Sequence, residues 1–326
     1  MKEELKDYIE KVATSVVNKL NMNSDDKTYT YEEVSVTKNN GMKRNGFTVI
    51  ESDNNIAPSF YVNTYFESNE DVDKVADMFY DIYLESVNDN VLAGNNIIKN
   101  IDDFDLVKDN IFVFLCNYAK NSDFEGPNVK VGDLMIRFKI IIRQGEDGLF
   151  TIPITKEIYD KWNTGLTSEE FLDMAYANTK KLFPLKISSL EDIINDKLKE
   201  QDLSLPKIEN EMYVVTNDTN INGAIYMLDN NVLSDLSDKM NSSKLIILPS
   251  SIHETIVIPY NDAIKDEDGM EYISHMIEEI NVNVLSDEEY LSDTPYVYDK
   301  DTNKLIYTDN EISIPFIAWY FYLNLL

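Results

Sequence analysis

The stretch of residues 212–262 constrains the fold more than any other, because short apolar runs and turn signals alternate in it. Residues 212–216 form a β-prone run that ends at a cluster of Asn, Asp and Thr, whose side chains favour turns. Three apolar residues within 233–240 recur at the spacing of one helical face. Residues 244–248 and 255–258 are rich in branched side chains, and a proline follows each run. The stretch therefore predicts a strand, a helix and an antiparallel pair of strands.

Helical and strand-like segments are mixed along the rest of the chain. Apolar residues at helical spacing predict amphipathic helices over residues 2–20, 72–83 and 270–280. Capping boxes at residues 167–170 and 188–191 predict two more helices, over residues 168–182 and 189–200. Period-two and β-branched runs predict strands over residues 29–37, 47–50, 59–65, 134–142, 149–154, 295–298 and 304–307. Asn39-Asn40-Gly41 and Asn45-Gly46 are turn signals between the first two strands, and residues 101–119 fit either a helix or a buried strand. The pattern predicts an α+β fold with mixed, largely antiparallel sheets and packed amphipathic helices.

The length of 326 residues favours two units over a single small domain. We predict an N-terminal α+β unit over residues 1–122, a C-terminal α+β unit over residues 123–311, and an apolar tail over residues 312–326. Residues 201–211 contain a proline and several charges without a period, so they are the best internal linker. The uncharged tail is shorter than the roughly 20 residues that a membrane-spanning helix needs. We expect it to be a packed element, with a peripheral anchor or a C-terminal extension as alternatives.

The net charge limits the classes of partner. Lys and Arg number 29 against 59 Asp and Glu, which gives a net charge of −30. Nucleic-acid backbones and anionic membranes repel such a chain, so we expect no direct nucleic-acid binding, no membrane span and, as partner, a basic protein. From Asp262 to Glu289, ten acidic residues stand against Lys265 alone. This run is either a solubilising surface or an array of carboxylates that imitates a nucleic-acid backbone.

Cys116 is the single cysteine, which excludes an internal disulfide and a cysteine-based zinc cluster. Its apolar surroundings favour a buried, inert thiol over a nucleophile. The first 20 residues are charged throughout and lack the apolar core of a signal peptide, so we expect a cytoplasmic protein. We expect no cofactor, because neither a phosphate-binding glycine loop nor a dinucleotide fingerprint occurs.

Ser250, Ser251, His253 and Glu254 supply the residue types of a hydrolase triad. Neighbours along an extended segment alternate sides, so His253 and Glu254 are expected to point apart. Neither serine stands in a Gly-x-Ser-x-Gly elbow. We therefore expect a polar hairpin connection, and a hydrolase or small-molecule enzyme that uses these residues is the alternative.

His275 has Glu271 and Glu279 at i−4 and i+4, on one helical face that could hold a divalent metal. Helices in an acidic chain produce such triplets by chance. We therefore expect a solvated acidic face and no metal site.

Four phrases of the sequence resemble an uncharacterised family of gut-dwelling Gram-positive anaerobes that is known only as a domain of unknown function. They are MYVVTN (212–217), NGAIYML (222–228), LPSSIHE (248–254) and YLSDTPYVYD (290–299). The order of elements from about residue 150 is also distantly similar to the YtpQ-like family, which has no assigned activity. The family pattern has a proline-histidine pair where this chain has Pro127-Asn128, so a histidine role is absent there. The resemblance implies no catalytic residue, and we expect a noncatalytic protein-interaction or regulatory module.

Overall fold

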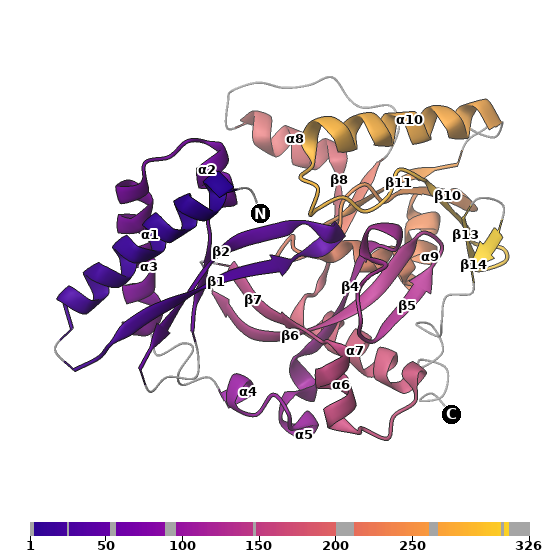
Figure 1. The fold of residues 1–326 in the computed structure, drawn as a ribbon. Helices are drawn as coiled ribbons and strands as arrows, with labels where there is room; N and C mark the ends of the chain where they lie inside the picture. The colour runs from indigo at the N-terminus through magenta and orange to yellow at the C-terminus, as the bar shows by residue number, and fades with distance from the viewer. Residues whose placement is uncertain are drawn as a thin grey trace. The chain divides into compact units, whose positions relative to one another are not determined.

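The computed structural model describes residues 3–24, 26–52, 57–88, 96–145, 148–199, 212–260, 267–307 and 310–312. The chain divides into two compact units, residues 1–100 and 101–326. Both contain helices and antiparallel strands (Figure 1), which confirms the predicted α+β class. The domain limits predicted at residues 122 and 311 stay a prediction.

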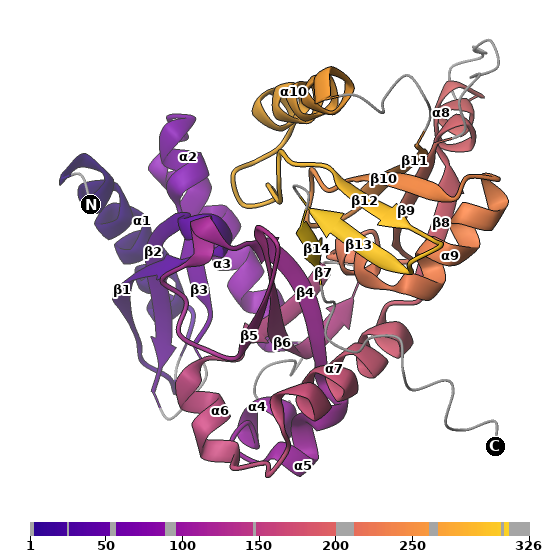
Figure 2. The ribbon, with the colours of Figure 1, turned by 90° about the vertical axis from the view of Figure 1, so that its right-hand side faces the viewer.

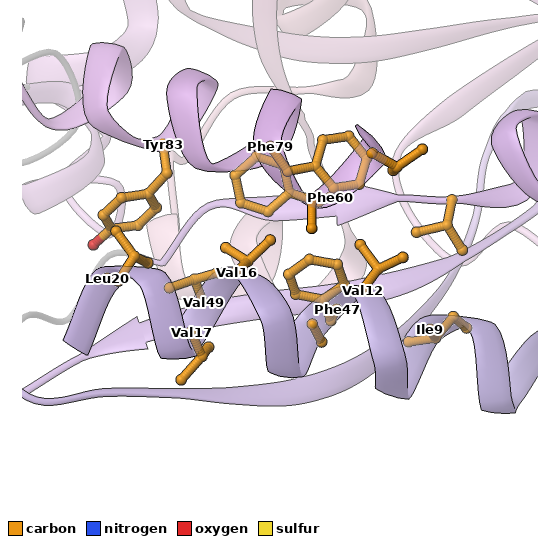
Figure 3. Close-up of a cluster of buried hydrophobic side chains, with 14 of the residues drawn as sticks. Ile9, Val12, Val16, Val17, Leu20, Phe47, Val49, Phe60, Phe79 and Tyr83 are labelled. Atoms are coloured by element: carbon orange, nitrogen blue, oxygen red, sulfur yellow. The ribbon is translucent and has the colours of Figure 1, made fainter. Parts of the chain in front are cut away.

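The first unit is a three-stranded antiparallel sheet of order β1-β2-β3, with helices on one face. Its elements are α1 (Glu3–Met22), β1 (Tyr29–Thr37), η1 (Asn39–Gly41), β2 (Lys43–Glu51), β3 (Ser59–Tyr61), α2 (Asn63–Glu67), α3 (Val72–Asn88) and α4 (Asn96–Lys99). Figure 3 shows apolar side chains of α1 and α3 meeting aromatic side chains of the sheet. The rings of Phe60 and Phe79 lie 4.9 Å apart at the centre of this core.

The turn predicted at Asn45-Gly46 is wrong, because both residues lie inside β2. A Cβ atom on Gly46 would lie 1.8 Å from the carbonyl oxygen of Phe60 on β3, so the glycine serves the close approach of two strands. The chain turns instead at η1, where Asn40 adopts a positive φ of 56°. The strand predicted through residue 65 ends at Tyr61, and α2 follows it.

The second unit begins with a four-stranded antiparallel sheet of order β4-β6-β5, with β7 also paired to β6. Its elements are α5 (Phe104–Val107), η2 (Lys108–Asn110), β4 (Ile111–Asn117), η3 (Ala119–Asn121), β5 (Asn128–Val131), β6 (Leu134–Gly145), β7 (Gly148–Pro153), α6 (Lys156–Trp162) and α7 (Ser168–Leu182). The ambiguous segment 101–119 contains both kinds of element: α5 and η2 are its helical part, and β4 is a strand in which every residue is buried. Because β4 pairs with β6 along its whole length, it belongs with the residues that follow it.

A seven-stranded antiparallel sheet completes the second unit, with the order β14-β13-β12-β10-β11-β9-β8. Its strands and helices are β8 (Leu185–Ser189), α8 (Leu190–Lys199), β9 (Tyr213–Asn217), η4 (Gly223–Leu228), α9 (Asn230–Lys239), β10 (Lys244–Leu248), β11 (Thr255–Pro259), α10 (Glu267–Val284), β12 (Tyr296–Asp299), β13 (Lys304–Tyr307) and β14 (Asn310–Ile312). The predicted antiparallel pairing of β10 with β11 and the predicted final hairpin are both confirmed.

α10 covers one face of this sheet, and α9 lies on the other side of it (Figure 2). η4 contacts β9 and β11, and α9 contacts β10. Ile273 and Ile277 of α10 pack against Ile246 and Leu248 of β10. Because side chains alternate along a strand, Leu245 and the other odd-numbered residues of β10 point to the opposite face. Residues on the outer side of α10, among them Tyr272 and His275, are exposed to solvent.

Two sequence predictions fall on segments that the structure does not describe: the linker at residues 201–211 and residues 313–326 of the tail. Ile312, the first residue of that tail, ends β14 and pairs with Leu305. Within the described parts of the chain, no helix combines the length and the apolar character needed to cross a membrane.

Candidate functional site

The connection between β10 and β11, residues 249–254, is fixed by backbone hydrogen bonds to residues 289–292. The amides of Leu291 and Ser292 donate to the carbonyls of Ser250 and Pro249, each at 2.9 Å. In the other direction, the amide of Ile252 donates to the carbonyl of Glu289 at 2.9 Å. The LPSSIHE and YLSD phrases of the sequence are therefore neighbours in space.

The NGAIYML phrase closes the other side of the same connection. The amide of Gly223 donates to the carbonyl of His253 at 2.9 Å, and the hydroxyl of Thr216 donates to the same oxygen at 2.8 Å. Asn222 has a positive φ of 58°, and a Cβ on Gly223 would lie 2.7 Å from the carbonyl oxygen of His253. The Asn-Gly pair thus serves a left-handed turn and a close backbone approach, which few other residue pairs allow.

The imidazole of His253 bridges these segments. Its Nδ1 accepts the Asn222 amide at 3.2 Å, and its Nε2 lies 3.6 Å from Oε1 of Glu289. The neutral ring therefore carries its proton on Nε2, facing the carboxylate. The side chain is 29% exposed, and this burial lowers the pKa of His253 below its ordinary value. Glu289 and Glu254 raise that pKa, and Lys139 lowers it.

The two serines are engaged in local structure. Oγ of the buried Ser251 accepts the backbone amide of His253 at 3.1 Å, which forms a short side-chain turn. Ser250 contributes its carbonyl to Leu291. Among the hydrogen bonds of the described residues, none joins the imidazole of His253 to either hydroxyl. The structure thus brings Ser251, His253 and Glu289 together, but without the hydroxyl-to-imidazole contact that activates a nucleophile.

A half-buried carboxylate lies beside this connection and was missed from sequence. Asp133, in the turn between β5 and β6, accepts the hydroxyl of Ser292 at 2.6 Å and the hydroxyl of Tyr296 at 2.5 Å. Burial raises the pKa of Asp133, and the two hydroxyl donors lower it. Asn117 of β4 adds a bond from its amide group to the carbonyl of Leu291 at 2.9 Å. These contacts join the four-stranded sheet to residues 289–296. The only sequence signal was Gly132-Asp133, which is typical of an ordinary turn.

His275 lies on the outer side of α10. Its ring nitrogens are 3.7 Å from a carboxylate oxygen of Glu271 and 3.5 Å from one of Glu278, and its side chain is 68% exposed. The structure therefore places Glu278, rather than Glu279, as the second carboxylate beside the ring. Across the described ranges, no three His, Cys, Asp or Glu side chains are grouped in a way that could hold a metal ion.

The outer side of α10 combines negative charge with exposed apolar surface. Between Glu267 and Glu289 the sequence has eight acidic residues and neither Lys nor Arg. On this helix Tyr272 is 66% exposed, Val282 78% and Met276 37%. The carboxylates of Glu271 and Glu278 stand beside them, also exposed. We call this surface, formed by the exposed residues of α10, the acidic face.

Comparison with known proteins gives a family and no activity. A family of unknown function matches the chain over residues 5–300, which includes every segment of the connection and the acidic face. Neither a curated protein nor a solved structure matches the chain.

Proposed function

The chain belongs to DUF5688, a family of unknown function, and we propose that it is a noncatalytic module that binds a basic protein. The observation that supports this proposal is the acidic face of α10. Large apolar side chains are exposed there on a regular helix, next to carboxylates. Exposed aromatic and methionine side chains are enriched at protein interfaces, whereas a purely solubilising surface needs none.

The charge of the acidic face determines the kind of partner. A second copy of this chain would bring the same carboxylates against each other, and a nucleic acid would bring phosphates against them, so both are repelled. A partner with Lys or Arg around an apolar pocket would pair with Glu271 and Glu278 while it buried Tyr272 and Val282. In the most specific form of the proposal, the carboxylates of the acidic face occupy a groove of the partner protein that otherwise holds a nucleic-acid backbone.

The single cysteine, Cys116, is buried and free. A free thiol suits a reducing compartment, and we place the binding in the cytoplasm.

A capture experiment with matched variants tests the proposal. The purified chain is immobilised, and a lysate of the native host is passed over it at about 0.15 M and about 1 M salt, where the screening length falls from roughly 8 to 3 Å. Glu271→Gln/Glu278→Gln/Glu279→Gln removes three charges from the acidic face and preserves side-chain shape. Glu3→Gln/Glu4→Gln/Glu10→Gln removes three charges from the exposed side of α1 and is the control.

We expect one basic protein to bind the wild-type chain and the α1 variant, and to be lost from the α10 variant and at high salt. Tyr272→Ala should weaken binding at about 0.15 M salt although it leaves the charge of the acidic face unchanged, because its contribution is apolar. Competition by duplex DNA for the captured protein would support mimicry of a nucleic-acid backbone. Equal capture by the α10 variant, or capture that resists 1 M salt, would contradict the proposal.

A further inference from the structure

Arg137 is a buried cation in the middle of the four-stranded sheet. It lies on β6 opposite Phe114 of β4 and Asn128 of β5, and only 8% of its surface is exposed. Its guanidinium carbon is 3.5 Å from the ring centre of Phe124, and Nη1 donates to Oδ1 of Asn121 at 3.2 Å. The aromatic stack and this bond fix the plane and the direction of the group.

No described carboxylate compensates the charge of Arg137. Its neighbours that influence its ionisation include no Asp or Glu, and burial lowers its pKa. The neighbouring thiol of Cys116 cannot supply the negative charge, because burial raises the pKa of Cys116 to about 11 and the thiol is neutral at pH 7. Nε of Arg137 is buried and has no hydrogen-bond partner among the described residues. A buried charge in this condition is destabilising until an anion pairs with it.

A second cation lies on the same face of β6. Lys139 is two residues further along the strand, so its side chain leaves the sheet on the same side. Its Nζ lies 4.0 Å from the ring centre of Phe114, and the guanidinium carbon of Arg137 lies 5.6 Å from the same centre. Both positive charges thus meet at one aromatic ring, in a chain whose net charge is −30.

We propose that Arg137 is the anchor of an anion-binding site that takes the carboxylate or phosphate group of a small molecule. Asn121 accepts from Nη1 and the thiol of Cys116 lies beside the guanidinium, whereas Nε has no partner among the described residues, so we assign the Nε edge to the ligand. That edge presents two parallel N–H groups, the geometry that accepts two oxygens of a carboxylate or phosphate at once. Lys139 adds a second positive charge on the same side of the sheet. The site is separate from the acidic face and does not depend on the protein-binding role.

Nuclear magnetic resonance of the arginine side chains tests the site directly. The chain has three arginines, Arg44, Arg137 and Arg143, so a correlation spectrum of Nε–H groups contains at most three signals. The signal that disappears in Arg137→Met is that of Arg137. If this variant does not fold, Arg44→Met and Arg143→Met assign the other two signals, and the remaining one belongs to Arg137. Inorganic phosphate and, in a second arm, acetate are titrated into the full-length chain at constant ionic strength held with KCl.

We expect a saturable shift of the Arg137 signal alone with phosphate, acetate or both, and the comparison of the two arms tells which oxyanion the site prefers. Thermal unfolding gives a second measurement: above the dissociation constant, the Tm of the wild-type chain should rise by about 3 °C for each tenfold increase in the concentration of free anion. Arg143→Met, which removes the same charge from the same strand, should keep this rise, and Arg137→Met should lose it. An Arg137 signal that moves with neither anion would overturn the proposal, as would an equal rise of Tm in Arg137→Met.

Discussion

Replacing His253 by alanine distinguishes a histidine that stabilises the fold from one that acts in catalysis. In the native state Nδ1 accepts the amide of Asn222, and that amide has no other acceptor among its described hydrogen bonds. His253→Ala therefore leaves a half-buried N–H group unpaired, which lowers the free energy of unfolding by about 1–3 kcal/mol. The expected value at pH 8 is about 2 kcal/mol, because the ring is partly exposed and water replaces part of the lost bond.

The effect of the variant should depend on pH in a defined direction. Burial lowers the pKa of His253 in the folded chain below the value of about 6.5 in the unfolded chain. A group with a lowered folded pKa contributes stability that is present above the unfolded pKa and is lost as the pH falls through the folded pKa. Protonation also places a hydrogen on Nδ1, where it opposes the amide of Asn222. The difference between the wild-type chain and His253→Ala should therefore shrink between pH 7 and pH 5.

Urea denaturation of both chains across this pH range measures the difference. His275→Ala is the matched control, because it removes the other histidine from a side chain that is 68% exposed, and it should change the free energy of unfolding by less than about 0.5 kcal/mol at pH 8. A difference that stays constant or grows as the pH falls would refute the reasoning. It would mean that a charged His253 paired with Glu289 holds the connection in place.

Three further perturbations test other parts of the structure. Asp229 is almost fully buried, accepts Tyr176 at 2.9 Å and pairs with Lys180 at 2.7 Å, so Asp229→Ala should lower the free energy of unfolding by about 3–5 kcal/mol in urea denaturation. A loss below about 1 kcal/mol would contradict the pairing. Gly46→Ala should destabilise the first unit by about 3 kcal/mol or more, measured by the same method, because its Cβ would meet the carbonyl oxygen of Phe60. Finally, raising KCl from about 0.05 to about 0.5 M should raise the urea midpoint of the wild-type chain, since screening relieves repulsion in a chain of net charge −30; a midpoint that falls would exclude repulsion as the dominant effect of salt.

Local sequence signals predicted the elements whose structure is decided within a few residues. The runs closed by Pro249 and Pro259 became β10 and β11, and the apolar spacing in residues 2–20 became α1. Asn45-Gly46 was misread because a glycine serves two purposes, a turn or a close approach of strands. The second depends on Phe60, which is 14 residues away and has no local signature.

The polar contacts of the site could not be predicted, because they join segments that are far apart in the chain. Asp133 and Ser292 are separated by 159 residues, and Asn222 and His253 by 31. Alternation along the strand predicted over residues 134–142 is enough to put Arg137 and Lys139 on one side of it, but no local pattern tells which residues cover that side. Only the folded chain shows that Arg137 lies against Phe124 without a described carboxylate beside it.

The hydrolase alternative now requires a specific movement. A general base needs a free lone pair directed at a hydroxyl, and in neutral His253 the only lone pair of the ring, on Nδ1, accepts the Asn222 amide. To release it, residues 222–224 must leave the connection, which also breaks the bonds from Gly223 to His253 and from Ala224 to Ile252. At about 0.5–1.5 kcal/mol for each of the three bonds, the open state lies about 1.5–4.5 kcal/mol above the closed one. Fewer than about one molecule in ten would then hold a competent base, so binding of a substrate would have to supply the remaining free energy.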